Sequence, residues 1–219
     1  LVQNVEYAEN QIEDAKLLIG DVDSTSASVT AALDELTPLL EMFPAGGPIR
    51  VRMETSLGDI ILELYADEAP ITVANFLSYV DADIYDATVF HRVVAGFVVQ
   101  GGGFYFDAED PNLFVAAATM DPIENESSNG LKNIERTVAM ARTSDPDSAT
   151  SQFYFNLADN TNLDYIDGAE GYAVFAEVIE GWGVIKSAET SPLSSLSIPG
   201  VGNQIPQALV RVTVVTRSP

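Results

Sequence analysis

One stretch of the sequence places a guanidinium and an amide within an otherwise apolar surface. Residues 89–103 read VFHRVVAGFVVQGGG, and Arg92 and Gln100 supply these two groups. β-Branched and aromatic residues dominate the stretch, which predicts two strands joined at Ala95-Gly96 and followed by three glycines. Removing the charge of an arginine from water costs free energy, so a half-buried arginine is expected to have a paired partner or a functional role. On this stretch alone, a structural role for Arg92 in an ion pair on a strand is a simpler interpretation than a catalytic role.

Cysteine and histidine, two residue types that enzymes often use for covalent or metal chemistry, are scarce. The chain has no cysteine, and its one histidine is His91, so a His- or Cys-based zinc site is not expected. No G-x-S-x-G signature is present, and Gly101-Gly102-Gly103 lacks the G-K-[ST] ending of a phosphate-binding loop. The acidic residues that most resemble a calcium cluster miss the EF-hand spacing and favour a solvated loop: Asp159, Asp164, Asp167 and Glu170. We therefore expect no metal and no cofactor.

Four motifs in a fixed order resemble those of a known family. They are FHRVVAGFVVQGG at 90–102, VAMART at 138–143, SATSQFYFN at 148–156 and GYAVFAEVIEG at 171–181. Their order and spacing are similar to those of cyclophilin-type peptidyl-prolyl cis-trans isomerases, and NGLKN at 129–133 resembles the bacterial type. The resemblance covers roughly residues 49–215 and leaves out the first 48.

The resemblance implies one catalytic residue, Arg92, and a groove that binds the substrate. Phe97 and Val98 match the floor of the proline pocket, and Gln100 matches the glutamine that contacts the substrate backbone. The full set of implied substrate-binding residues is Phe97, Val98, Gln100, Ala141, Arg142, Gln152, Tyr154, Leu163 and Tyr172. His91 and Asn162 are expected at the periphery of the site, His91 as a packed neighbour rather than a proton shuttle.

Several positions depart from the family pattern, and three of them bear on the binding groove. Val98 replaces a common methionine, and Tyr154 stands where a phenylalanine usually closes the pocket, so its hydroxyl needs a partner or water. Asn162 stands where the family has an aromatic residue that helps to bind cyclosporin, which predicts weak binding of that inhibitor.

The implied reaction needs no nucleophile, proton donor or metal. Rotation about a peptide bond is opposed by about 18–20 kcal/mol because the nitrogen shares its lone pair with the carbonyl. A fixed guanidinium can donate to that nitrogen when the amide is twisted, and it stays charged at every relevant pH. We expect a peptidyl-prolyl cis-trans isomerase that assists protein folding. The alternative is a cyclophilin-like module that binds proline segments or assists assembly with little turnover.

Two regions with different patterns make up the chain. Residues 1–48 carry apolar residues at helical spacing and end in FPAGGP, which predicts a helical hairpin before a boundary. This hairpin is expected to pack on the main domain, or to mediate self-association or binding of a partner. Residues 49–219 predict a mainly β, eight-stranded antiparallel cyclophilin-like barrel capped by two helices.

Local patterns assign most elements of the second region. Alternation predicts a hairpin over 49–53 and 59–65 and a last strand at 209–215, and further strands are predicted at 137–141, 152–156 and 172–179. Helical spacing predicts helices that begin at Pro70 and at Trp182. Residues 104–129 predict an irregular connection, and residues 191–206 predict a loop rich in Ser, Pro and Gly.

The net charge restricts the classes of partner. It is −23 over 219 residues, with three lysines and a pI near 4.1. Such a surface repels phosphate backbones and anionic lipids, so nucleic-acid binding is not expected. No apolar run approaches the about 20 residues that span a bilayer, so membrane insertion is not expected either. Proline-containing peptides and unfolded proteins are the expected partners. The charge fits salt adaptation or an exported protein, and the start at Leu1 favours a periplasmic or exported location.

Overall fold

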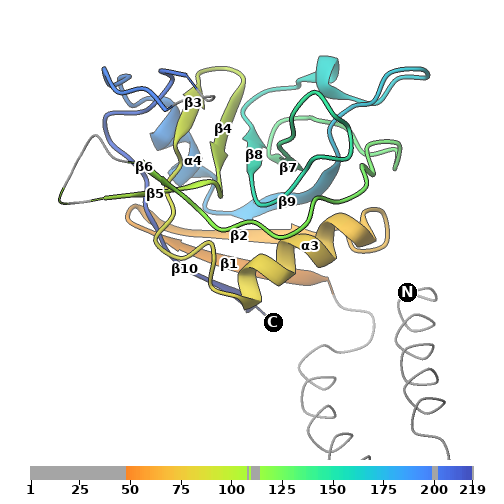
Figure 1. Ribbon diagram of the computed structural model, residues 1–219, viewed down its shortest axis with the longest axis horizontal. Helices are drawn as coiled ribbons and strands as arrows, with labels where there is room; N and C mark the ends of the chain where they lie inside the picture. The colour runs from red at the N-terminus through yellow and green to blue at the C-terminus, as the bar shows by residue number, and fades with distance from the viewer. Residues whose placement is uncertain (1–47, 108, 110–113, 199–201, 219) are drawn as a thin grey trace, which may run out of the picture. The chain divides into compact units, whose positions relative to one another are not determined.

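The computed structural model describes residues 48–218 except 108, 110–113 and 199–201 (Figure 1). Ile49–Ser218 forms one compact unit, and everything below concerns this unit. The predicted helices of the N-terminal segment fall within residues 1–47, outside the described residues. Their structure and their binding surface stay predictions.

Eight strands form a single antiparallel sheet in the order β10-β1-β2-β9-β7-β8-β4-β3. The strands are β1 (Ile49–Thr55), β2 (Gly58–Leu64), β3 (Arg92–Val94), β4 (Val98–Gly101), β7 (Thr137–Met140), β8 (Phe153–Asn156), β9 (Val174–Glu180) and β10 (Val212–Ser218). In Figure 1, β1, β2 and β10 lie on one side and β3, β4, β7 and β8 on the other, with β9 between them.

Backbone hydrogen bonds join the two ends of this sheet. The Phe90 amide donates to the Val210 carbonyl at 3.0 Å, and the Val212 amide donates to the Thr88 carbonyl at 2.8 Å. Thr88 and Phe90 lie shortly before β3, Val210 lies shortly before β10 and Val212 is the first residue of β10, and these two strands are the outermost of the sheet. The links close the sheet through the segments that lead into its two outermost strands. The predicted eight-stranded antiparallel barrel is therefore confirmed.

Alternation along the strands divides their side chains between two apolar clusters. Val99 and Phe155 pair across β4 and β8 and belong to the main core. Their neighbours Val98 and Tyr154 belong to a second, smaller cluster. Successive side chains of a strand point to opposite faces, so the second cluster lies on the other face of the same strands.

Two α-helices accompany the sheet, as predicted. Helix α3 (Pro70–Asp81) begins at its proline and packs beside β10, and its Phe76 ring lies 5.1–5.5 Å from the rings of Tyr85, Phe153 and Phe175. Helix α4 (Trp182–Glu189) packs beside β2, β3 and β4. It starts after Gly181, which has φ +79° and where a Cβ would lie 2.0 Å from the Asp59 carbonyl oxygen. Only glycine fits there.

The prediction of an irregular connection over 104–129 was wrong in part. A short hairpin, β5 (Phe104–Phe106) and β6 (Phe114–Ala116), occupies its first half. The Phe106 and Phe114 rings lie 5.4 Å apart, so cross-strand aromatic packing supports strands of only three residues. A 3₁₀ turn (Thr161–Leu163) is a second element without a sequence signal. In the described part of the chain, no helix has the length and apolar character needed to cross a membrane.

Candidate active site

Strand register aligns the predicted catalytic residue with three other residues across the sheet. Arg92 on β3 lies opposite Gln100 on β4, Gln100 lies opposite Tyr154 on β8, and Tyr154 lies opposite Ala139 on β7. Directly opposed residues of antiparallel strands share a face. The register therefore brings Arg92, Gln100 and Tyr154 to the face that carries the second apolar cluster.

Arg92 is half-buried and is held by two neutral amides. Its Nε donates to Gln204 Oε1 at 2.9 Å, and its Nη1 donates to Gln100 Oε1 at 3.4 Å. Gln100 is held in turn, because its Nε2 donates to Gln152 Oε1 at 2.8 Å. Within the described ranges, no carboxylate forms an ion pair with Arg92. The ion pair suggested by the first stretch is therefore absent from the described part of the chain.

The environment of Arg92 is polar without being acidic. Burial lowers the pKa of the Arg92 guanidinium, and the nearby Tyr172 opposes this shift. An arginine nevertheless stays charged at any pH at which proteins are folded. Among the described residues, no neighbouring carboxylate cancels the positive charge that the site thus holds.

The second apolar cluster contains six of the predicted binding residues. Val98 and Tyr154 are its buried base, with exposed fractions of 2% and 4%. Partly buried residues pack on this base and form its reachable surface: Phe97, Ala141, Leu163 and Tyr172, with Tyr65 and Leu131 beside them. Tyr172 meets Tyr154 edge to face at 6.0 Å. The cluster is an apolar surface of the kind that a proline ring can bind.

The Tyr154 hydroxyl has the partner that the sequence required. It donates to Asn133 Oδ1 at 2.8 Å, and Asn133 is fully buried. Burial raises the pKa of the Tyr154 hydroxyl well above its ordinary value. Tyr154 therefore stays neutral and keeps this proton donor over the working pH range.

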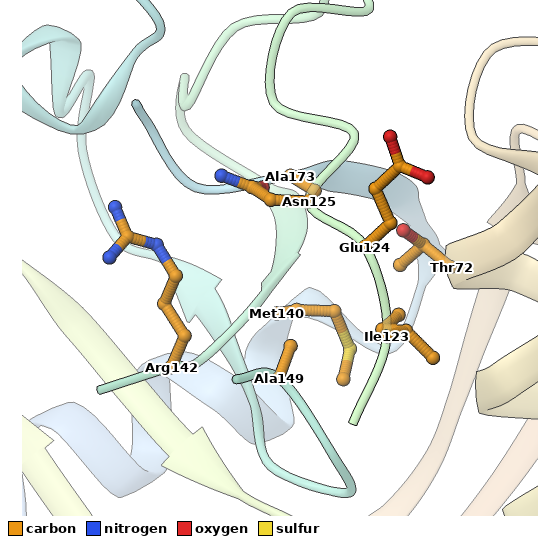
Figure 2. A pocket seen from close by; sticks show the side chains of 8 residues that line it. All are labelled: Thr72, Ile123, Glu124, Asn125, Met140, Arg142, Ala149 and Ala173. Carbon is orange, nitrogen blue, oxygen red and sulfur yellow. The ribbon is translucent and has the colours of Figure 1, made fainter. Parts of the chain in front are cut away.

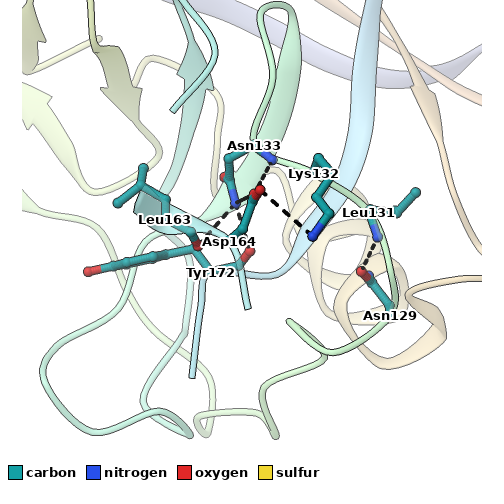
Figure 3. Close-up of polar contacts among 7 residues, drawn as sticks. All are labelled: Asn129, Leu131, Lys132, Asn133, Leu163, Asp164 and Tyr172. Carbon is teal, nitrogen blue, oxygen red and sulfur yellow. Dashed lines mark hydrogen bonds and ion pairs between the residues drawn. The ribbon is translucent and has the colours of Figure 1, made fainter. Parts of the chain in front are cut away.

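Asn133 also fixes two segments that form the wall of the cluster (Figure 3). Its Nδ2 donates to the Leu163 carbonyl at 3.2 Å and to the Tyr172 carbonyl at 3.3 Å. Its backbone amide donates to Asp164 Oδ1 at 2.7 Å. The sequence offered one signal for Asn133, its place in NGLKN, but gave no role for it.

Arg142 does not present its guanidinium as a free donor. The guanidinium donates to the carbonyl oxygens of Thr143, Glu170 and Gly171 at 2.9–3.2 Å and lies 4.4 Å from the centre of the Tyr172 ring. These contacts hold Tyr172 in the wall of the cluster. Arg142 also lines a small pocket with Thr72, Ile123, Glu124, Asn125, Met140, Ala149 and Ala173 (Figure 2). Arg142 is the one predicted site residue at this pocket, so the pocket is distinct from the apolar cluster.

The two residues expected at the periphery have different environments. His91 is fully buried, and its ring lies 4.8 Å from that of Phe104. Burial lowers the pKa of His91 to about 4, so the ring is neutral at neutral pH. Asn162 is exposed in the 3₁₀ turn.

The acidic residues considered for calcium support loops instead. Asp164 accepts from Asn133, Asp159 Oδ1 accepts from the Glu135 amide at 3.0 Å, and Glu170 Oε2 accepts from Ser127 Oγ at 3.2 Å. Over the described residues, no group of three or more histidine or acidic side chains is arranged to hold a metal ion.

The comparisons with known proteins agree with this geometry. The family model described as "Cyclophilin type peptidyl-prolyl cis-trans isomerase/CLD" matches residues 50–216. The chain belongs to this family. A peptidyl-prolyl cis-trans isomerase of Acinetobacter baylyi is 46% identical to this cyclophilin over 165 residues, which cover 75% of this chain and 83% of the relative. Peptidyl-prolyl cis-trans isomerase B of Escherichia coli is 46% identical over 138 residues, which cover 62% and 80%. The predicted resemblance to bacterial cyclophilins is confirmed.

A solved structure supports the fold independently. The cyclophilin-type peptidyl-prolyl cis-trans isomerase of Cryptosporidium parvum, crystallised in the presence of the dipeptide Ala-Pro, matches with a TM-score of 0.61 at 23% identity. The match covers 78% of this cyclophilin and 99% of that chain.

Proposed function

We propose that this cyclophilin is a peptidyl-prolyl cis-trans isomerase that accelerates rotation about X–Pro bonds of protein substrates, with Arg92 as its catalytic residue. One observation carries the assignment of Arg92. Its guanidinium is fixed by two neutral amides on the sheet face that carries the apolar cluster. A fixed, uncancelled positive charge beside an apolar surface suits a proline ring and its amide.

The Arg92 guanidinium has more N–H donors than its two described hydrogen bonds use. An arginine has five N–H donors, and the two described contacts use one on Nε and one on Nη1. Among the described residues no acceptor binds the remaining three, which a substrate can therefore use. In a twisted X–Pro amide the nitrogen lone pair is localised and can accept one of them. This hydrogen bond strengthens only at the transition state, which is the kind of interaction that raises the rate.

The magnitude of this effect sets a limit on what Arg92 can supply. A hydrogen bond to a charged group contributes about 1.5–3 kcal/mol, and each tenfold of rate needs about 1.4 kcal/mol. Arg92 therefore accounts for about one or two powers of ten. The rest must come from holding the X–Pro segment in a twisted shape. We assign this task to Phe97, Leu163 and Tyr172, which belong to the partly buried surface of the cluster.

The direct test is the cis-to-trans isomerisation of a short peptide that contains Ala-Pro. We expect acceleration over the spontaneous rate, nearly unchanged between about pH 6 and 9 because arginine does not titrate there. The assay is run at low and at high salt, since a net charge of −23 is tolerated better when it is screened. Activity only at high salt would support salt adaptation.

The binding-module alternative predicts a different result. In that case the peptide binds, as followed by chemical-shift changes, but exchange between its isomers is not accelerated at either salt concentration. A role of residues 1–48 in self-association is tested on the full chain by sedimentation, where a monomer at all concentrations would exclude it.

A further inference from the structure

We propose that Gln204 is a positioning residue for catalysis, which fixes the orientation of the Arg92 guanidinium from a loop 112 residues away in the sequence. The inference rests on the proposed function of Arg92.

Gln204 holds Arg92 more directly than Gln100 does. Its Oε1 accepts from Nε of Arg92 at 2.9 Å, whereas the Gln100 contact on Nη1 is 3.4 Å long. The Nε–H lies in the guanidinium plane next to the aliphatic stem, so a hydrogen bond there restrains rotation of the whole plane. Loss of Gln204 would leave the plane held by the longer contact alone.

The backbone of Gln204 is fixed to the same strand. Its carbonyl oxygen accepts from the Val93 amide at 2.7 Å, so consecutive residues of β3 bind its side chain and its main chain. β3 is the last strand of the sheet, which leaves this amide free for a partner outside the sheet. The two contacts together set both the position and the direction of the Gln204 amide.

Neighbouring residues anchor the Gln204 segment in the fold. Ile205 is fully buried, and its carbonyl oxygen accepts from the Ser194 amide at 2.7 Å. Pro206 forms an isolated bridge with Leu193. Gln204 is therefore held by packed residues on its C-terminal side, and its amide is set in place before a substrate binds.

The chemistry of an amide suits this task. A carboxylate at the same position would hold Nε at least as firmly, but it would cancel much of the charge that the transition state uses. An amide oxygen accepts the same N–H and leaves the net charge of Arg92 unchanged. Substitutions of Gln204 can therefore test the two effects separately: alanine removes the hydrogen bond to Arg92, and glutamate keeps it but adds a negative charge.

The test compares Gln204→Ala with Gln207→Ala in the full chain. Gln207 is a matched control, because it is exposed, lies in the same segment and donates to the Leu193 carbonyl at 3.1 Å without touching Arg92. We expect kcat/KM for the Ala-Pro peptide to fall about tenfold in Gln204→Ala, mainly in kcat, and to stay within about twofold of wild type in Gln207→Ala. Gln204→Glu should also lower kcat, because the added carboxylate would cancel much of the positive charge of Arg92.

A second readout does not depend on turnover. The Nε–H of Arg92, followed by NMR in protein with ¹⁵N-labelled arginine, should exchange with solvent at least about tenfold faster in Gln204→Ala. It should stay protected in Gln207→Ala and in Gln204→Glu.

Two results would overturn the proposal: unchanged kcat in Gln204→Ala, or equal losses in Gln204→Ala and Gln207→Ala. A further arm uses an Arg92→Lys background, which lacks the Nε–H. Adding Gln204→Ala there should change the rate by less than about twofold, whereas a full second loss contradicts action through Arg92. An inactive wild type would instead refute the proposed function itself. In that case the protection of the Arg92 Nε–H from exchange would still test its hydrogen bond to Gln204.

Discussion

Replacing His91 by leucine should make the protein more resistant to acid. His91 is fully buried, and neither ring nitrogen has a hydrogen-bond partner of good geometry in the described part of the chain. Weak contacts with Val89 and Gln152 offset burial only in part, and the charge of Arg92 adds to the effect, so the pKa of His91 is lowered to about 4. His91→Leu removes the ionisable ring and breaks no hydrogen bond of good geometry.

The direction and the magnitude follow from the two pKa values of His91. In the unfolded chain a histidine has a pKa of about 6.5, so the unfolded state binds the proton first as the pH falls. The folded state therefore loses stability from about pH 6.5 down to about pH 4. Between pH 7 and pH 5 the loss from His91 is about 2 kcal/mol.

Urea unfolding of both proteins at pH 7 and pH 5 measures this effect. The carboxylates are common to both proteins and cancel in the difference between them. We expect the free energy of unfolding of His91→Leu, relative to wild type, to rise by about 2 kcal/mol at pH 5. A difference that stays constant within about 0.5 kcal/mol between the two pH values would refute the assignment of a buried neutral histidine.

Two further substitutions test contacts that the sequence did not predict. Glu126 accepts from the amide and the hydroxyl of Thr72, both at 2.7 Å, at the start of α3, where Ala69 provides no side-chain cap. Glu126→Ala should therefore cost about 1–2 kcal/mol in urea unfolding, and an equal loss in the exposed Glu124→Ala would contradict the capping role. Tyr154→Phe should cost about 1 kcal/mol, because the Asn133 oxygen loses a donor. It should keep isomerase activity within about threefold of wild type, since the ring that forms the pocket base remains, and a larger loss of activity would assign the hydroxyl a role in the reaction.

The sequence predicted the parts of the fold that depend on local patterns. Alternation assigned β1, β2 and β10, β-branched and aromatic residues assigned β3 and β4, and Pro70 marked the start of α3. The hairpin β5–β6 was missed because its three-residue strands lie in a segment rich in acidic residues, whereas β3, of the same length, lies in a run of β-branched residues. The barrel itself came from the resemblance, because counting strands does not select their order.

The candidate site also contains residues that could be assigned from the sequence and residues that could not. The resemblance assigned Arg92 and the residues of the apolar cluster, which strand register and packing then bring to one face. Asn133 and Gln204 had no assigned role, because each acts on residues that are far away in the sequence. A polar residue in a loop gives no local signal of a buried partner. The neutral support of Arg92 also could not be predicted, since an ion pair is the commoner way to hold a buried arginine.

The catalytic role of Arg92 is tested most directly by measuring substrate binding and bond rotation separately in Arg92→Ala. NMR exchange spectroscopy on an Ala-Pro peptide gives the rate of isomerisation on the protein, and titration gives the Kd. We expect the rate to fall at least about tenfold while Kd changes less than about threefold, because Arg92 acts at the transition state. A rate on the protein that stays unchanged while Kd rises would contradict this catalytic role, since Arg92 would then only bind the substrate.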